Sequence, residues 1–217
     1  MSFVDVRCFS YLDRLIIKLD MFLDVTIVRD PEEFIERCDY PMAESSITEA
    51  ESRYSGALMR VNHSGEVSAQ GLYLGQAVFA KDQDTASFMV SAAADERKHL
   101  AWCARRLREL NSDQSLFTAV WFYGSFVIGG LASLAGDRRN LGFVEETEKQ
   151  VSRHLDGHLS RIPLHDQITR QILEQMRQDE IEHGVLAKRL GAVDPPQLVK
   201  RIMGFGALIM KEVSYRF

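Results

Sequence analysis

Two short segments of the chain pair a glutamate with a histidine three residues later. They are Asp95-Glu96-Arg97-Lys98-His99 and Asp179-Glu180-Ile181-Glu182-His183. On a helix, a three-residue step brings both side chains to the same face, one turn apart. Each segment could therefore give a metal ion one oxygen and one nitrogen ligand. A single Glu-x-x-His pair is common on solvated surfaces, but two copies that each begin with aspartate indicate a metal site.

Two further glutamates stand at matching distances from these segments. Glu66 lies 30 residues before Glu96, and Glu148 lies 32 residues before Glu180. In an antiparallel helical hairpin, residues at equal height are symmetric about the turn, and the two midpoints are residues 81 and 164. Both midpoints fall in polar or proline-containing segments that are typical of turns. The sequence therefore predicts two hairpins of one plan, offset by 82 to 84 residues, that form a four-helix bundle around two metal ions.

The residues selected by this spacing are four glutamates and two histidines. The expected metal ligands are Glu66, Glu96, His99, Glu148, Glu180 and His183. This set suits iron or manganese better than zinc, which takes fewer and softer ligands, or calcium, which does not take histidine. We assign the metal-bridging positions to Glu66 and Glu148. The ligands alone leave open hydroxylation by O₂, iron storage, peroxide disproportionation and radical generation.

Three further side chains could act near the site. Tyr73 is seven residues after Glu66 on the same helix face, so its hydroxyl is expected near the ligands. His154 is six residues after Glu148, and we expect it at the rim of the site, where it could relay protons. His63, one turn before Glu66, is favoured as a supporting or structural residue rather than as a ligand.

Each Glu-x-x-His pair is preceded directly by an aspartate, Asp95 or Asp179. A metal-bound histidine usually donates its other ring N–H to a carboxylate, which fixes the tautomer and the orientation of the ring. We therefore expect the two aspartates to hold the ligand histidines, with ordinary surface charge as the alternative.

Apolar periodicity predicts where the helices lie. The four bundle helices are expected at about 56–80, 85–110, 141–159 and 168–190. Residues 1–28 are predicted to form an amphipathic helix, and residues 29–54 a polar tether. We therefore divide the chain into an N-terminal segment, 1–55, and a bundle domain, 56–217.

Two apolar segments are not needed to build the bundle. Residues 116–135 carry no charge and are long enough to span a bilayer. A single span would separate Glu96 from Glu148, so we expect a crossover between the hairpins that packs on the bundle or dips into one leaflet, with a buried core helix as the alternative. Residues 198–217 form an amphipathic helix bordered by cations, which suits a membrane surface, the bundle or a subunit interface.

Length and composition exclude several classes of protein. A chain of 217 residues that is 46% hydrophobic suits a globular domain with a sizeable core. The net charge of −5 argues against nucleic acid as the main partner, because phosphate binding needs a dense basic face. Cys8, Cys38 and Cys103 lack motif spacing and are expected to be reduced thiols. Charges throughout the N-terminus argue against a cleaved secretory signal.

Four segments together resemble the demethoxyubiquinone hydroxylases of ubiquinone biosynthesis. They are 60–66 (Arg-Val-Asn-His-Ser-Gly-Glu), 95–99, 144–148 and 179–183. The first is the most family-specific, and the resemblance covers about residues 56–217. It implies an all-α, ferritin-like four-helix bundle in which the six ligands hold two iron ions. It also implies hydroxylation of the ring of a polyprenyl methoxy-methyl-benzoquinol, with O₂ as co-substrate and an external reductant, ultimately NADH. We find no nucleotide-binding fingerprint, so the immediate electron donor stays open.

A polyprenyl quinol resides in the bilayer, so the resemblance also implies contact with a membrane surface. We expect a peripheral membrane protein on the cytoplasmic side of a bacterial cell membrane, with 116–135 and 198–217 on the apolar route to the metal site. A homo-oligomer or a quinone-delivery partner is compatible with this expectation. The alternatives are a ferritin- or rubrerythrin-like iron-handling protein and a membrane-bound structural protein whose Glu-x-x-His pairs are fortuitous.

Overall fold

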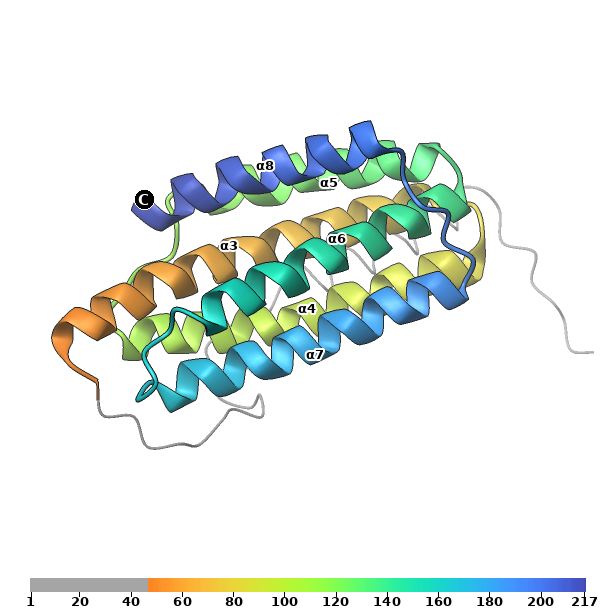
Figure 1. Ribbon diagram of the computed structural model, residues 1–217. Helices are drawn as coiled ribbons and strands as arrows, with labels where there is room; N and C mark the ends of the chain where they lie inside the picture. Colours follow the sequence, from red (N-terminus) through yellow and green to blue (C-terminus); the bar gives the residue numbers. More distant parts are fainter. Residues whose placement is uncertain (1–46) are drawn as a thin grey trace, which may run out of the picture.

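In the computed structural model, the described residues are 47–217, and they form six helices and no strand (Figure 1). The helices are α3 (Glu49–Phe79), α4 (Gln83–Glu109), α5 (Thr118–Leu134), α6 (Asp137–Leu159), α7 (Gln167–Arg189) and α8 (Gln197–Arg216). The predicted all-α fold class is confirmed. The amphipathic helix expected at 1–28 and most of the tether lie outside the described residues.

Four of these helices form the bundle, and two lie on top of it. The helices α3 and α4 form one antiparallel hairpin, α6 and α7 form the other, and α5 connects them along the length of α3 (Figure 1). The last helix, α8, packs on α3 and α6. The bundle therefore has one side covered by α5 and α8, while α4 and α7 form the opposite side.

The first helix begins seven residues earlier than predicted. Thr48 and Glu51 form a capping box, in which the backbone N–H of Thr48 donates to the Glu51 carboxylate at 2.8 Å and the N–H of Glu51 donates to the Thr48 hydroxyl at 3.3 Å. The prediction of a tether up to residue 54 was wrong because it overlooked this Thr-x-x-Glu signal.

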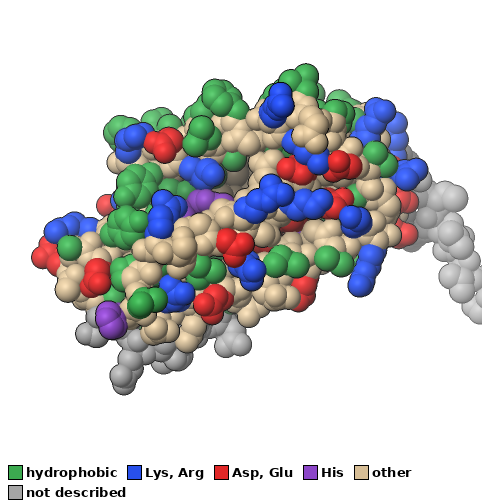
Figure 2. Space-filling view, viewed as in Figure 1, with side chains coloured by type: hydrophobic (Ala, Val, Ile, Leu, Met, Phe, Trp, Pro, Cys, Tyr) green, Lys and Arg blue, Asp and Glu red, His purple; other side chains and the backbone are tan. Residues whose placement is uncertain are grey.

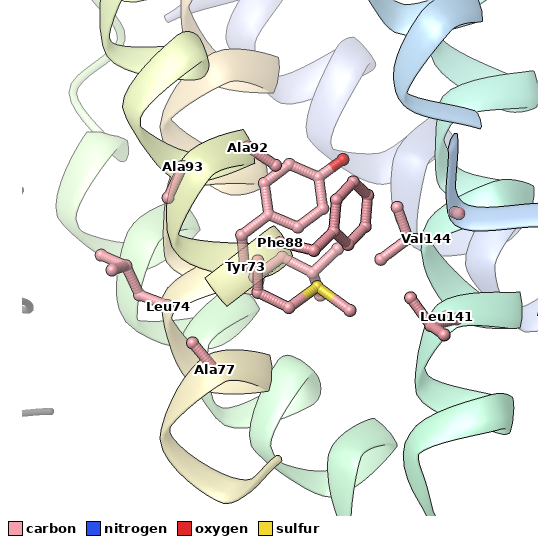
Figure 3. Close-up of a cluster of buried hydrophobic side chains, with 11 residues drawn as sticks. Tyr73, Leu74, Ala77, Phe88, Ala92, Ala93, Leu141 and Val144 are labelled. Carbon is pink, nitrogen blue, oxygen red and sulfur yellow. The ribbon is translucent and has the colours of Figure 1, made fainter. Parts of the chain in front are cut away.

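Two hydrophobic clusters fill the bundle, one toward each end. The first surrounds Tyr73, and Figure 3 shows its ring beside Phe88 and Ala92, with Leu141 and Val144 of α6 facing them. The second contains Leu58, Met59, Trp102, Leu107, Leu155, Ile172, Leu173 and Met176, among others. On every bundle helix, the predicted ligands lie between the residues of one cluster and those of the other. The predicted site is therefore enclosed by apolar side chains along the bundle axis.

Glycines bring α5 into direct contact with α3. A Cβ atom on Gly71, Gly75 or Gly129 would overlap a backbone carbonyl of the facing helix. Tyr123, Val127, Ile128, Leu131 and Leu134 of α5 are exposed. Phe122 and Phe126 pack on the first cluster, and only Gly129, Gly130 and Ser133 are fully buried. The prediction of a crossover packed on the bundle is therefore confirmed, whereas the alternative of a buried core helix was wrong. None of the described helices combines the length and apolarity needed to cross a membrane.

A buried ion pair fastens the α6–α7 turn to α4. The guanidinium of Arg106 donates to the Asp166 carboxylate at 2.7 Å and to the Thr169 hydroxyl at 2.9 Å. Asp166 is fully buried, and it also accepts from the backbone N–H of Thr169 at the start of α7. The start of α7 in the second hairpin is thus tied to α4 by a buried charge pair.

Replacing Asp166 by alanine should destabilise the metal-free protein by about 3 kcal/mol, because Arg106 would keep its partly exposed partner Glu109 but lose its fully buried one, and the start of α7 would lose its capping acceptor. Urea unfolding followed by circular dichroism would measure the change. The control is Arg53→Ala, which removes an exposed pair with Glu49 and should cost less than about 1 kcal/mol. An equally small effect for Asp166→Ala would contradict this role of the buried pair.

Candidate metal centre

The six predicted ligands meet in the middle of the bundle. One glutamate comes from each of α3, α4, α6 and α7, and the histidines come from α4 and α7. All six side chains are buried except that of His183, which is 12% exposed. A buried face with four carboxylates is costly unless positive charge compensates them.

The ligand atoms form two groups that share two residues. The first group is Glu66, Glu96, His99 and Glu180, and the second is Glu96, Glu148, Glu180 and His183. Within each group the donor atoms lie within 4.8 Å of one another. We call them the His99 group and the His183 group. Each group combines a histidine and a glutamate of one hairpin with the two glutamates of the Glu-x-x-His pairs.

The glutamates of the Glu-x-x-His pairs face both groups. The Nδ1 atom of His99 lies 3.3 Å from Oε2 of Glu96 and 3.4 Å from Oε1 of Glu180. The Nδ1 atom of His183 lies 3.7 Å from Oε1 of Glu96 and 3.9 Å from Oε2 of Glu180. Each of these carboxylates therefore directs one oxygen toward each group, which is the geometry of a bridging ligand.

The structure does not place Glu66 and Glu148, the residues predicted to bridge, in both groups. Glu66 lies 3.6 Å from Nδ1 of His99 and Glu148 lies 3.9 Å from Nδ1 of His183, and each belongs to one group only. The physical reason is that α4 and α7 each bring a Glu-x-x-His pair to the centre, so that their two glutamates lie between the groups. Glu66 and Glu148 come from α3 and α6, and each faces one group only.

The donor set fits metal ions. Within the described part of the chain, Oε2 of Glu66, Oε1 of Glu96 and Nδ1 of His183 are buried without a hydrogen-bond partner. Such unpartnered atoms are rare in a folded interior, and here they converge on the two groups. Carboxylate and imidazole ligands in this number match the sets of two-metal carboxylate proteins.

The electrostatics of the site reflect crowded carboxylates. Burial raises the pKa of Glu66 and of Glu148 well above the usual range, and the charges of neighbouring glutamates raise both further. Burial alone would lower the pKa of the two histidines. Hydrogen bonds to Asp179 and to ligand glutamates nevertheless raise the pKa of His99, and Glu180, Glu96 and Asp95 raise that of His183 to about 9. Without metal, the site therefore holds protons that metal ions would displace.

Both predicted aspartate–histidine contacts are present, and both cross between the hairpins. The Nε2 atom of His99 lies 2.9 Å from Oδ2 of Asp179, and that of His183 lies 3.3 Å from Oδ2 of Asp95. When Nε2–H donates to the aspartate, Nδ1 is left as the free ligand atom that faces the glutamates. Each aspartate therefore orients the histidine of the opposite Glu-x-x-His segment, a crossing that the sequence pattern does not reveal.

The remaining predicted residues take different places. The Tyr73 hydroxyl donates to the Glu148 carboxylate, and burial together with that charge raises the pKa of the phenol well above its usual range. His63 is buried outside both groups, and burial lowers its pKa to about 4. His154 is also outside both groups, with its ring 3.9 Å from that of His158. Its role as a proton relay stays a prediction.

Three contacts around the His99 group were missed by the sequence reasoning. The indole of Trp102 packs on the His99 ring with 5.5 Å between centroids. Asp179 accepts hydrogen bonds from Lys98 at 3.4 Å and from Gln175 at 2.7 Å. Trp102 and Gln175 could have been found from their three- and four-residue spacing to His99 and Asp179, which places them on the same helix faces.

Comparisons with known proteins identify the family of this chain. The family model described as "Ubiquinone biosynthesis protein COQ7" matches residues 53–214. Three similar bacterial proteins are named 3-demethoxyubiquinol 3-hydroxylase. That of Nitrosococcus oceani is 44% identical over 211 residues (96% of this chain and 98% of the relative), that of Xanthomonas campestris pv. campestris 43% over 212 residues (97% of each), and that of Ralstonia pickettii 47% over 172 residues (79% of each). This chain therefore belongs to the ubiquinone biosynthesis protein COQ7 family.

Proposed function

We propose that this protein is a monooxygenase that hydroxylates the ring of a polyprenyl demethoxyubiquinol with O₂, using two iron ions held by the His99 and His183 groups. The names of its relatives support the reaction and the substrate class. The observation that carries the metal assignment is the pair of buried ligand groups that share Glu96 and Glu180. Electrons come from an external reductant derived from NADH.

Each part of the site has a distinct task in this reaction. Glu66 and His99 would hold one iron and Glu148 and His183 the other, with Glu96 and Glu180 available to both. When bound, the two irons would supply the activation of O₂: one oxygen atom enters the ring as a hydroxyl group, and the other leaves as water with two electrons from the external reductant and two protons. The hydrophobic clusters at both ends exclude water from the centre.

The protein's own protons are held at defined atoms. Tyr73 keeps its hydroxyl proton, because its pKa is raised, and this O–H group donates a hydrogen bond to Glu148. Asp95 and Asp179 keep the Nε2 protons of the two histidines directed away from the metal positions. These hydrogen bonds keep the ligand atoms directed toward the centre when the carboxylates gain or lose protons or metal.

Metal content and product analysis would test the function together. The purified protein should bind about two irons per chain and, with reductant and O₂, add one oxygen atom to a short-chain demethoxyubiquinol analogue. Glu180→Ala should lower hydroxylation by more than about 100-fold, because it removes a ligand shared by both groups. The matched control is Glu174→Ala, an exposed glutamate of the same helix. Iron without product would favour the iron-handling alternative, and a fully active Glu180→Ala variant would refute the site.

Iron binding should release protons. The raised pKa values of Glu66, Glu148 and His183 mean that the metal-free site is protonated near neutral pH. Because Fe²⁺ competes with those protons, its affinity should rise with pH, by about tenfold per unit for each proton displaced. Anaerobic titration in weakly buffered solution would measure the protons released, and Glu66→Gln should release fewer. An affinity that is independent of pH would contradict the protonated state of the site.

We further propose that the side covered by α5 and α8 rests on the cytoplasmic face of a bacterial cell membrane. Figure 2 shows hydrophobic side chains along the edge formed by α8, above a hollow between this helix and the bundle. On this side, the apolar residues that are more than half exposed are Leu116, Val120, Tyr123, Val127, Ile128, Leu131 and Leu134 on and beside α5, and Leu198, Ile202, Phe205, Leu208 and Phe217 on and beside α8. Patches of this kind mark interaction sites. A quinone-delivery partner or a second copy of the chain would use the same surface.

Charged substitutions on this surface should weaken membrane binding. Leu131→Glu and Phe205→Glu should each lower the affinity for anionic liposomes by about tenfold or more, because each removes a side chain worth about 1.5–3 kcal/mol of apolar burial. Leu164→Glu is the control, since Leu164 is 73% exposed but lies in the α6–α7 turn. Sedimentation with vesicles would measure binding, and unchanged binding of both test variants would overturn the proposal.

A further inference from the structure

We propose that the two metal positions differ in strength: the His99 group holds its metal firmly, whereas the His183 group holds it loosely and is the position where metal exchanges. This inference rests on the proposed two-iron centre. It concerns the residues around the ligands rather than the ligands themselves, which are of the same types in both groups.

The two histidines are held with unequal contacts. The distance from Nε2 of His99 to Asp179 is 2.9 Å, and that from Nε2 of His183 to Asp95 is 3.3 Å. The side chains of the supporting aspartates are 18% exposed for Asp179 and 51% exposed for Asp95. The bond to His183 is therefore both longer and more open to competition from water.

The two Glu-x-x-His segments are 84 residues apart, so each residue that supports His99 has a counterpart 84 residues away, at the same position relative to His183. Lys98 precedes His99 and donates to Asp179 at 3.4 Å. Its counterpart is Glu182, which accepts from Gln178 at 2.9 Å. A carboxylate at this position cannot donate to Asp95, and it adds a like charge where Lys98 supplies an opposite one.

Two further pairs differ in the same direction. Gln175 donates to Asp179 at 2.7 Å, whereas its counterpart Ser91 is exposed. Among the described residues, the Asp95 side chain makes one contact, which is that with His183. Buried Trp102 covers the His99 ring, and its counterpart Leu186 is 44% exposed. Within residues 47–217, the counterparts of Lys98, Gln175 and Trp102 thus make no equivalent contact around the His183 group, and only Asp95 repeats the role of its own counterpart, Asp179.

The ligand atoms themselves show the same difference. Nδ1 of His99 has its three carboxylate oxygens at 3.3 to 3.6 Å, and Nδ1 of His183 has its own at 3.7 to 3.9 Å. Atoms bound to one ion at about 2.0–2.2 Å lie roughly 3 Å apart when they are neighbours around it. The His99 group is therefore closer to a metal-binding arrangement, and the His183 group must contract further.

Metal release would test the inference without reference to activity. The protein loaded with Fe²⁺ is mixed anaerobically with excess of a coloured ferrous chelator. We expect two phases of about one iron each, with the fast phase at least about tenfold faster than the slow one. Glu148→Gln should remove the fast iron and keep the slow one. A single phase for two irons, or a fast iron retained in Glu148→Gln, would overturn the proposal.

Substitutions outside the buried ligand groups test the inference without disturbing the folding of the metal centre. Glu182→Lys places an ammonium group at the counterpart of Lys98 and should slow the fast phase by about tenfold, leaving the slow phase unchanged. The control is Glu174→Lys, which makes the same charge change at an exposed position of α7 and should alter neither phase. Lys98→Glu should accelerate the slow phase. Unchanged release rates in both Glu182→Lys and Lys98→Glu would show that the supporting residues do not determine how firmly each metal is held.

These outcomes separate the inference from the function on which it rests. Two irons that leave at one rate, together with hydroxylated product, would refute the inequality and keep the proposed function. Fewer than two irons bound at any pH would refute both. Two phases assigned by Glu148→Gln, with no product formed, would keep the inequality and refute the hydroxylase.

Discussion

The structure depends on one electrostatic constraint: four carboxylates share an interior from which water is excluded. Each would cost several kcal/mol if it were buried as an unpaired charge. The two ligand histidines and bound protons offset part of this charge, and metal ions would offset the rest. The surrounding features serve the same constraint, since Tyr73 and the two aspartates hold the centre through hydrogen bonds and two apolar clusters close it along the bundle axis.

The arrangement of the helices gives this centre two different sides. The side of α4 and α7 carries the polar residues that reach the histidines, including the half-exposed Asp95. The opposite side is covered by α5 and α8, and many of the apolar side chains of these two helices are exposed. Glycine contacts between α3 and α5 bring the crossover onto the bundle. One side thus suits exchange with water, and the other suits a substrate dissolved in a bilayer.

The sequence predicts those parts of the molecule that are set by spacing along one helix or across one turn. The six ligands and both hairpin turns belong to this class, because three-residue steps and midpoints need no tertiary information. The identity of the glutamates shared by both groups does not belong to it, because only the facing of α4 and α7 decides that Glu96 and Glu180, rather than Glu66 and Glu148, lie between the groups. The crossed aspartate contacts depend on the same facing. The early start of α3 was predictable from Thr48 and Glu51 and was overlooked.

The repetition of two hairpins explains both the success and the limit of the sequence reasoning. A repeated motif identifies ligands because the types of their donor atoms must repeat. It does not reveal how firmly each half would bind its metal, because this depends on residues that are free to differ, such as Lys98 and Glu182. In the proposed hydroxylase, one half can thus hold a metal firmly while the other stays exchangeable, although the motif Asp-Glu-x-x-His is the same in both.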